Sequence, residues 1–157
     1  MSAVLDGITV IIVMTLFGIA SIFGYMVLDE VNTDMVISND TVAAQEVVGD
    51  LHGKFPTLLD NLFLFAFILL GIFVLVSVFL IDTHPIFFIL SILLLVGVFI
   101  VGGIMANAFD DIMSDPSISE YANQFPYTGW IMTHLVELII ALTFLVTIAL
   151  FAKYRLT

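Results

Sequence analysis

Two ionisable side chains, His134 and Glu137, stand three residues apart in a stretch that is otherwise mostly apolar. Residues at this spacing share one face of a helix, so the two side chains can act together. Imidazole is a common metal ligand that titrates near neutral pH, and a paired carboxylate fixes its tautomer. The pair therefore points to proton transfer, metal binding or a hydrogen bond between helices.

The position of the pair limits this chemistry. His134 follows Trp130 by four residues, about 6 Å along a helix at 1.5 Å per residue, which places it near a membrane interface. Metal sites in four-helix bundles use two Glu-x-x-His motifs and further carboxylates, whereas this chain has one pair in reversed order. We therefore predict no metal, cofactor or catalytic site at this pair.

A polar cluster between helices is the interpretation that we favour. Asp60 and Asn61 stand at the start of another apolar segment, at the depth expected for His134 and Glu137. We predict that these four residues tie the fourth apolar segment to the second. A path for protons or cations through the same cluster is the alternative, because an ionisable group within a span is costly and often functional.

The elements that carry these residues follow from composition. Of the 157 residues, 62% are hydrophobic and only 11% are charged, whereas soluble domains carry roughly 25% charged residues. A bilayer core of about 30 Å needs around 20 apolar residues in a helix. The sequence predicts an all-α membrane protein, one transmembrane domain over residues 1–157, with four spans at about 8–28, 58–81, 85–106 and 130–152. The first segment lacks a preceding basic region and a following cleavage pattern, so we expect a retained anchor.

The two halves of the chain share one plan. Each half has a span, an acidic connection, a short amphipathic segment, a Phe-Pro pair and a second span. In the connection 107–129, Asp115 is a favourable helix cap and Pro116 suits the first helical position. We predict two helical hairpins, with a short amphipathic interfacial helix in this outer loop and another in the loop 29–57. Internal duplication and convergence on the needs of a membrane hairpin both explain the likeness.

Small residues predict where the spans approach most closely, because hydrophobicity does not drive helices together within a bilayer. Ala20 with Gly24, and Gly102 with Ala106, have the small-xxx-small spacing. We therefore expect a tight contact between the first and third spans. Three aromatic residues are expected at the membrane–water interface: Tyr121, Tyr127 and Trp130.

Charge is distributed unevenly along the chain, which has a formal net charge of −11 and only three basic residues. Lys153 and Arg155 follow the fourth span, so the positive-inside bias places both termini on the cytoplasmic-equivalent side. The two acidic connections then share the outer side, with Lys54 as their one base. Such a face repels nucleic acid and attracts cations or a basic partner, although a simple solvated surface is the plainer interpretation.

The four short-looped spans, the acidic outer face, the scarcity of bases and the segment Asp115–Met132 resemble small polytopic membrane proteins of tailless phages with an internal lipid membrane. The resemblance implies a structural, non-enzymatic component of the virion membrane. Such a protein would be present in multiple copies, organise the bilayer and contact other membrane or capsid proteins through its outer loops.

Two other classes of function remain open. One is a small channel, a holin-like pore or a proton-conducting subunit that uses Glu137 and His134. The other is an accessory subunit of a membrane enzyme complex, which fits the composition but identifies no chemistry.

Overall fold

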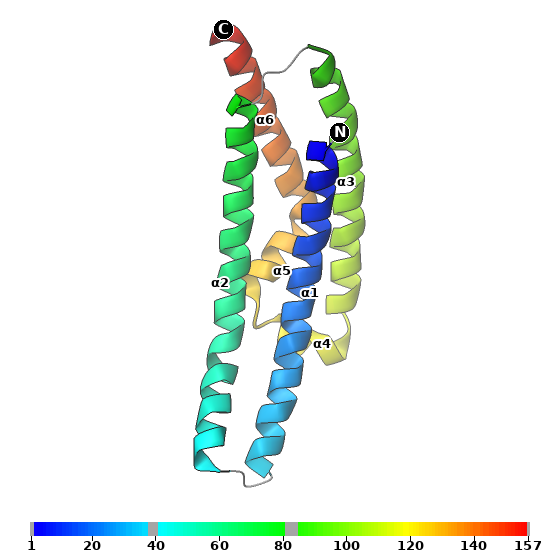
Figure 1. Ribbon diagram of the computed structural model, residues 1–157. Coiled ribbons are helices and arrows are strands. Elements are labelled where there is room, and N and C mark those ends of the chain that lie inside the picture. The colour runs from blue at the N-terminus through cyan, green and yellow to red at the C-terminus, as the bar shows by residue number, and fades with distance from the viewer. Residues whose placement is uncertain (1, 38–40, 81–84, 157) are drawn as a thin grey trace.

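In the computed structural model, all regular secondary structure of the described residues is α-helical, which confirms the predicted all-α fold (Figure 1). The described backbone comprises residues 2–37, 41–80 and 85–156, and side chains are described for residues 8–36, 41–77, 96–149 and 151–153. The helices are α1 (Ser2–Ile37), α2 (Val42–Leu80), α3 (Pro85–Met113), α4 (Pro116–Ala122), α5 (Pro126–Thr133) and α6 (Leu135–Leu156).

Four of these helices are long and apolar enough to cross a membrane, as the composition predicts. The chain is therefore a multi-pass integral membrane protein. The predicted turn between the second and third spans, at residues 81–84, lies outside the described residues. The apolar segments found in the described part are Ile8–Val36, Val42–Ser77, Val96–Met113 and Leu135–Lys153.

The first two helices continue well beyond the predicted spans. The predicted first span ends at residue 28 and the second begins at residue 58, but α1 ends at Ile37 and α2 begins at Val42. The predicted outer loop at 29–57 is therefore mostly helix. The separate amphipathic helix that we expected there is instead the first part of α2.

Pro56 lies inside α2 without ending it. Proline removes a backbone donor and usually kinks or breaks a helix interior. Here the proline is buried, and the residues before it are held against α1 by side-chain contacts. Gln45 Nε2 donates to the Met35 carbonyl at 3.1 Å. Nearer the proline, His52 Nε2 donates to Asp29 Oδ1 at 2.8 Å. Tertiary contacts thus outweigh the local preference of the sequence.

The short helix in the second connection begins where the sequence predicts. Asp115 is the N-cap of α4, Pro116 is its first residue, and Asp115 Oδ1 accepts the backbone N–H of Ser117 at 2.8 Å. The Ser117 hydroxyl donates to the same oxygen. This cap satisfies a backbone donor that a helix start leaves without an internal partner.

The predicted fourth span is divided at His134, which separates α5 from α6. His134 has φ −105° and ψ 19°, outside the helical range, although its backbone N–H still donates to the Trp130 carbonyl at 3.1 Å. The Thr133 hydroxyl donates to the Gly129 carbonyl at 2.9 Å, and such side-chain bonds to the preceding turn bend helices. The span therefore has a bend near one end rather than one straight axis.

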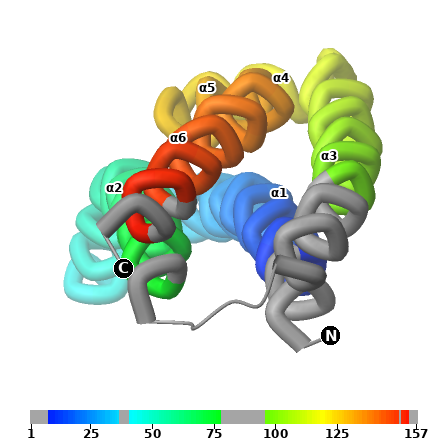
Figure 2. Tube along the Cα trace, turned by 90° about the horizontal axis from the view of Figure 1, so that it is seen from above, coloured from blue at the N-terminus to red at the C-terminus, as the bar shows by residue number. Residues whose placement is uncertain are grey.

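The helices form a bundle whose core lies at the level of α5. α1 packs along α2 and α3, and α6 packs along the same two helices; Figure 2 shows α1 between α2 and α3. α5 contacts both α2 and α3. The largest buried apolar side chains gather around it: Ile22, Phe63, Phe109, Phe125, Ile131 and Met132.

The small residues of the predicted contact accommodate side chains from other helices. α1 and α3 do pack together, but a Cβ on Gly24 would lie 3.5 Å from Phe55 Cζ of α2. A Cβ on Gly102 would overlap Ile139 Cδ1 of α6. Ala20 is exposed, and Ala106 is partly buried against the core. Gly24 and Gly102 thus make room for side chains of α2 and α6.

Candidate functional site

The carboxylate of Asp60 caps the start of α5 from a different helix. Asp60 lies on α2 and is only 3% exposed. Its Oδ1 accepts the backbone N–H of Thr128 at 2.7 Å and the Thr128 hydroxyl at 2.8 Å, while Oδ2 accepts the backbone N–H of Tyr127 at 3.0 Å. Phe125, the N-cap of α5, provides no side-chain cap of its own. A carboxylate here satisfies orphan donors and faces the positive end of the helix dipole.

Thr128 connects this cap to two further helices. The residue is 1% exposed, and its methyl group Cγ2 lies 3.0 Å from the position of a Cβ on Gly18 of α1. Phe63 of α2 and Phe109 of α3 also face this position, at 3.4 and 3.8 Å. The glycine therefore lets α1 come close to a threonine whose hydroxyl is fixed by Asp60. Sequence reasoning missed Gly18, because no small residue stands four positions away.

The four residues of the predicted polar cluster do not all meet. Asp60 ties α2 to the segment that leads into the fourth span, but through Tyr127 and Thr128 instead of His134 and Glu137. Asn61, His134 and Glu137 are exposed. The polar part of the contact between the second and fourth spans is therefore made by one carboxylate and a helix N-terminus.

His134 is held by its own helix. Its Nδ1 lies 2.9 Å from the Trp130 carbonyl oxygen and 3.1 Å from the Thr133 hydroxyl, and its ring stacks on the Trp130 ring with centroids 4.9 Å apart. Because a carbonyl only accepts hydrogen bonds, this contact assigns a hydrogen to Nδ1, and in a neutral ring Nε2 is then the acceptor. The residue as a whole is exposed. The Glu137 carboxyl group, in the first turn of α6, makes no hydrogen bond or ion pair with the side chains that the structure describes.

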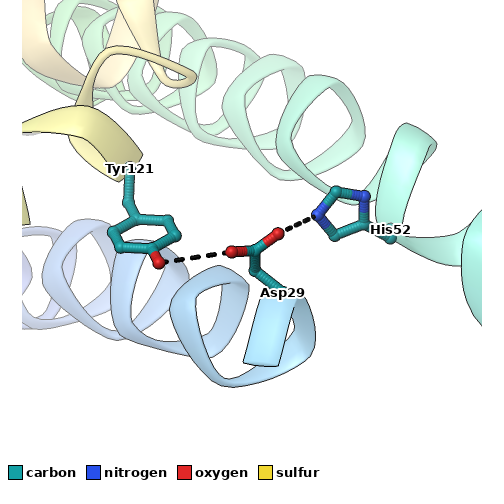
Figure 3. A network of polar contacts seen from close by, with 3 residues as sticks. All are labelled: Asp29, His52 and Tyr121. Atoms are coloured by element: carbon teal, nitrogen blue, oxygen red, sulfur yellow. Dashed lines mark hydrogen bonds and ion pairs between the residues drawn. The ribbon is translucent and has the colours of Figure 1, made fainter. Parts of the chain in front are cut away.

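A second polar network joins three helices nearer the connection between α1 and α2 (Figure 3). His52 Nε2 of α2 donates to Asp29 Oδ1 of α1 at 2.8 Å, and the Tyr121 hydroxyl of α4 donates to Asp29 Oδ2 at 3.2 Å. The Tyr25 ring covers this network, stacked on His52 with centroids 5.0 Å apart and edge-on to Tyr121 at 6.0 Å. Asp29 thus holds α4 and α2 against α1.

Sequence reasoning missed this network, since Asp29 and His52 both fall in the predicted outer loop 29–57 and Tyr121 was expected only at the membrane–water interface. A signal does exist in the sequence. Asp29 and His52 lie at nearly equal distances along the chain from the connection between α1 and α2, as Met35 and Gln45 do. In an antiparallel pair of continuous helices such residues face each other. The spacing predicts this contact only if both helices are known to continue through the predicted loop.

The surroundings of α4 shift two pKa values outside the spans. Burial raises the pKa of the Tyr121 hydroxyl above its ordinary value, and its hydrogen bond to Asp29 and the nearby charges of Glu120 and Glu30 raise it further. The side-chain and backbone hydrogen bonds from Ser117 lower the pKa of Asp115. The raised pKa keeps Tyr121 protonated as a donor, and the lowered pKa keeps Asp115 ionised as an acceptor. These are the states that hold α4 in place.

The interactions at these sites are helix caps and hydrogen bonds between helices. Among the residues whose placement is described, no three His, Asp or Glu side chains converge in a way that would hold a metal ion. A cavity of about 20 Å³ between α1, α2 and α5–α6 is lined mainly by apolar side chains, including Met14, Phe63 and Leu135. It has room for about one water-sized molecule but offers few polar partners to bind one.

No protein-family model, no curated protein and no solved structure matches the chain.

Proposed function

We propose that the chain is a structural membrane protein of a larger assembly, which organises the bilayer and binds a partner protein through the acidic ends of α1 and α2. The observation that carries the proposal is the continuation of these two helices beyond the level of the bundle core as one braced pair. Figure 1 shows that the pair reaches past α4 and the end of α3.

This projecting pair is well suited to docking because it is both rigid and acidic. The nine residues from Asp29 to Ile37 add about 13 Å of helix beyond the predicted first span. The hydrogen bonds of Gln45 and His52 to α1 hold the two helices together. Lys54, the base within the pair, is already bonded to Asp50 at 2.6 Å. The exposed acids are Glu30, Asp34, Glu46 and Asp50.

Apolar side chains are interspersed with these acids. Val36 is 60% exposed, Val42 79% and Val47 69%. Exposed apolar groups of this size, surrounded by charges of one sign, are typical of a protein interaction surface. The partner that fits is a protein with a basic surface and apolar side chains, because complementary charge speeds the encounter and excludes wrong partners.

The proposed placement in the membrane follows from the interfacial residues. Tyr127 and Trp130 are 49% and 56% exposed and are suited to the outer membrane–water interface, with α4 lying along it. Lys153 and Arg155 favour the cytoplasmic-equivalent side for both termini, which lie at the same end of the molecule in Figure 1. The chain then crosses the bilayer as two hairpins, and the acidic pair projects outward.

The assembly that we propose is a virion with an internal membrane, and the support for this part is the resemblance in plan and composition to small membrane proteins of tailless phages. In that setting, the acidic pair faces the protein shell and multiple copies line the vesicle. The proposed partners are capsid proteins and other membrane proteins of the particle.

Charge reversal of the projecting pair tests this function. In cells that produce the assembly, the wild-type chain should purify with the particle in fixed proportion to its shell protein. The variant Asp34→Lys/Glu46→Lys should insert into membranes normally but enter particles at least about tenfold less, since opposed like charges at an interface are costly.

The matched control is Asp110→Lys/Asp111→Lys, which makes the same change of charge on exposed residues of α3. It should enter particles at the wild-type level. Equal incorporation of both variants would contradict the role of the α1–α2 pair. Ion flux through liposomes that is lost in Glu137→Gln, without any effect on assembly, would support the transport alternative instead.

A further inference from the structure

One row of side chains on α5 and α6 points away from the bundle. The row follows spacings of four and three residues, which is the pattern of the seam between two helices in a left-handed pair. Every member is exposed, and Phe144 and Phe151 are 67% and 70% exposed. The row consists of Trp130, His134, Glu137, Ala141, Phe144, Ile148 and Phe151.

α6 packs against α2 and α3, but few of its residues are fully buried. Only 6% of the residues in its apolar window are buried, against 28% in that of α1. Lipid can cover apolar side chains such as Phe144, but it cannot satisfy a carboxyl group. Glu137 is therefore the member of the row for which a lipid environment is most unfavourable.

The fixed ring of His134 provides the complementary group. Its Nδ1 donates to the Trp130 carbonyl and the ring stacks on Trp130, so the imidazole is directed toward the preceding turn, away from Glu137 in the following one. Nε2 of a neutral ring is then the acceptor, and the residue is exposed. The two groups that could share a proton thus stand on one face of one chain but are not bonded to each other.

We propose that this row is the contact between two copies of the chain, in which Glu137 of each copy shares a proton with His134 Nε2 of the other. A two-fold contact places the same surface on both sides, so one His–Glu face forms two equivalent hydrogen bonds. The second copy is the occupant that fits, because the face carries both halves of the bonding pair. The inference rests on the membrane placement that the proposed function also uses.

Single cysteines test the contact directly, since the chain has none of its own. Ala141→Cys places a thiol in the row, and oxidation in a bilayer should produce a disulfide-linked dimer. The matched control is Ile100→Cys on α3, which is 55% exposed and lies at a similar level, because Gly102 of α3 faces Ile139 of α6. The control should form at least about tenfold less dimer. Equal cross-linking at both positions would overturn the proposal.

The polar pair is tested by substitutions that remove one half at a time. Glu137→Leu and His134→Phe should each weaken dimerisation by about tenfold or more, because each removes both hydrogen bonds of the symmetric pair. Glu137→Gln should retain the dimer, since its amide can donate to Nε2. Both side chains are exposed, so the helices should persist in these variants. Glu137→Leu is the cleaner of the two, because His134→Phe also removes the Nδ1 hydrogen bond to the Trp130 carbonyl.

Mixing the two defective variants gives the sharpest result. A His134→Phe chain keeps Glu137, and a Glu137→Leu chain keeps His134, so one bond can form in the heterodimer and none in either homodimer. With two different fluorescent labels, energy transfer in the mixture should exceed that in either variant alone. Transfer no higher than in the single variants would overturn the His–Glu pairing. Asp34 lies near the end of α1 and Glu46 near the start of α2, and Figure 1 shows these two helix ends away from α5 and α6, so failure of dimerisation is separable from failure of partner docking.

Discussion

The Asp60 carboxylate accepts the backbone N–H of Thr128 at 2.7 Å, so a side chain of α2 acts as the cap of α5. Three hydrogen bonds converge on this one buried group, and two of them come from main-chain donors. Asp60 and Thr128 are both buried, so the Thr128 donors depend on this carboxylate rather than on water.

Replacing Asp60 should loosen α5 specifically. Asp60→Ala leaves two backbone donors and one hydroxyl unsatisfied, and we expect a loss of about 2–4 kcal/mol in the free energy of unfolding. Trp130, the one tryptophan, lies on α5, so its fluorescence during denaturation in mixed micelles reports the change. Asn61→Ala, an exposed neighbour, is the control and should be nearly neutral. An equal effect of both variants would contradict the capping role.

Enlarging Gly18 should be costly for a specific steric reason. A Cβ there would lie 3.0 Å from Thr128 Cγ2, and the threonine cannot rotate away without losing its bond to Asp60. We expect Gly18→Ala to destabilise the protein by about 1–3 kcal/mol. Thr128→Ser keeps the hydroxyl and removes the methyl, so the double variant should regain part of the loss. Additive effects in this double-mutant cycle would show that the two residues are not coupled.

Gly102 offers a useful contrast with Gly18. The overlap that a Cβ on Gly102 would make is with Ile139 Cδ1, the far end of a flexible side chain. We expect Gly102→Ala to cost less than Gly18→Ala, although its initial overlap is closer, and Ile139→Val should remove the remaining cost. Equal unfolding midpoints for the two alanine variants would show that the Thr128 site is not more rigid.

The position of α4 should depend on pH in the alkaline range. The pKa of Tyr121 is raised in the folded protein, so its contribution is fully present below the unfolded value near 10 and is lost as pH rises through the folded value. Phenolate formation removes the donor to Asp29 and places like charges together. Proteolysis of the α4 region should therefore increase above about pH 10. In Tyr121→Phe, which lacks the hydroxyl, this pH step should disappear.

The N-cap of α4 should have the opposite pH dependence, because its contribution to stability is lost as pH falls. The pKa of Asp115 is lowered by its bonds to Ser117, so its contribution is present above the ordinary carboxyl value and is lost as pH falls through the folded one. Chemical shifts of the Ser117 amide should follow this titration, with a midpoint below that of an unpaired aspartate. Asp115→Asn, which also caps helices well, should keep the helix and abolish the titration. A Ser117 amide shift that still titrates in that variant would exclude Asp115 as its source.

The spans were predictable because a bilayer imposes a single strong requirement, a long run of apolar residues. The ends of α1 and α2 were not, since their outer parts are polar and Pro56 stands where a helix usually begins. Contacts far along the chain, such as Asp29 with His52, decide that α2 passes through this proline. Local sequence patterns do not reveal such long-range contacts.

Asp60 was predicted to connect the second and fourth spans, but its partners were not identified. Sequence reasoning matched it with the polar side chains at similar depth, His134 and Glu137. The groups that it binds belong mainly to the main chain, which every residue possesses, so residue type gives no indication of them. Only the position of the α5 start, fixed by packing around Thr128, makes those donors available.

The cap of α5 has a consequence for how the protein is made. Asp60 and Thr128 are separated by 68 residues, so the second helix enters the membrane long before its partner has been synthesised. During that interval the carboxylate lies near the bilayer edge with none of its three final donors. Insertion of the fourth span therefore also supplies the hydrogen-bond donors that Asp60 of α2 requires. A nascent chain halted after α3 therefore lacks all three donors of Asp60.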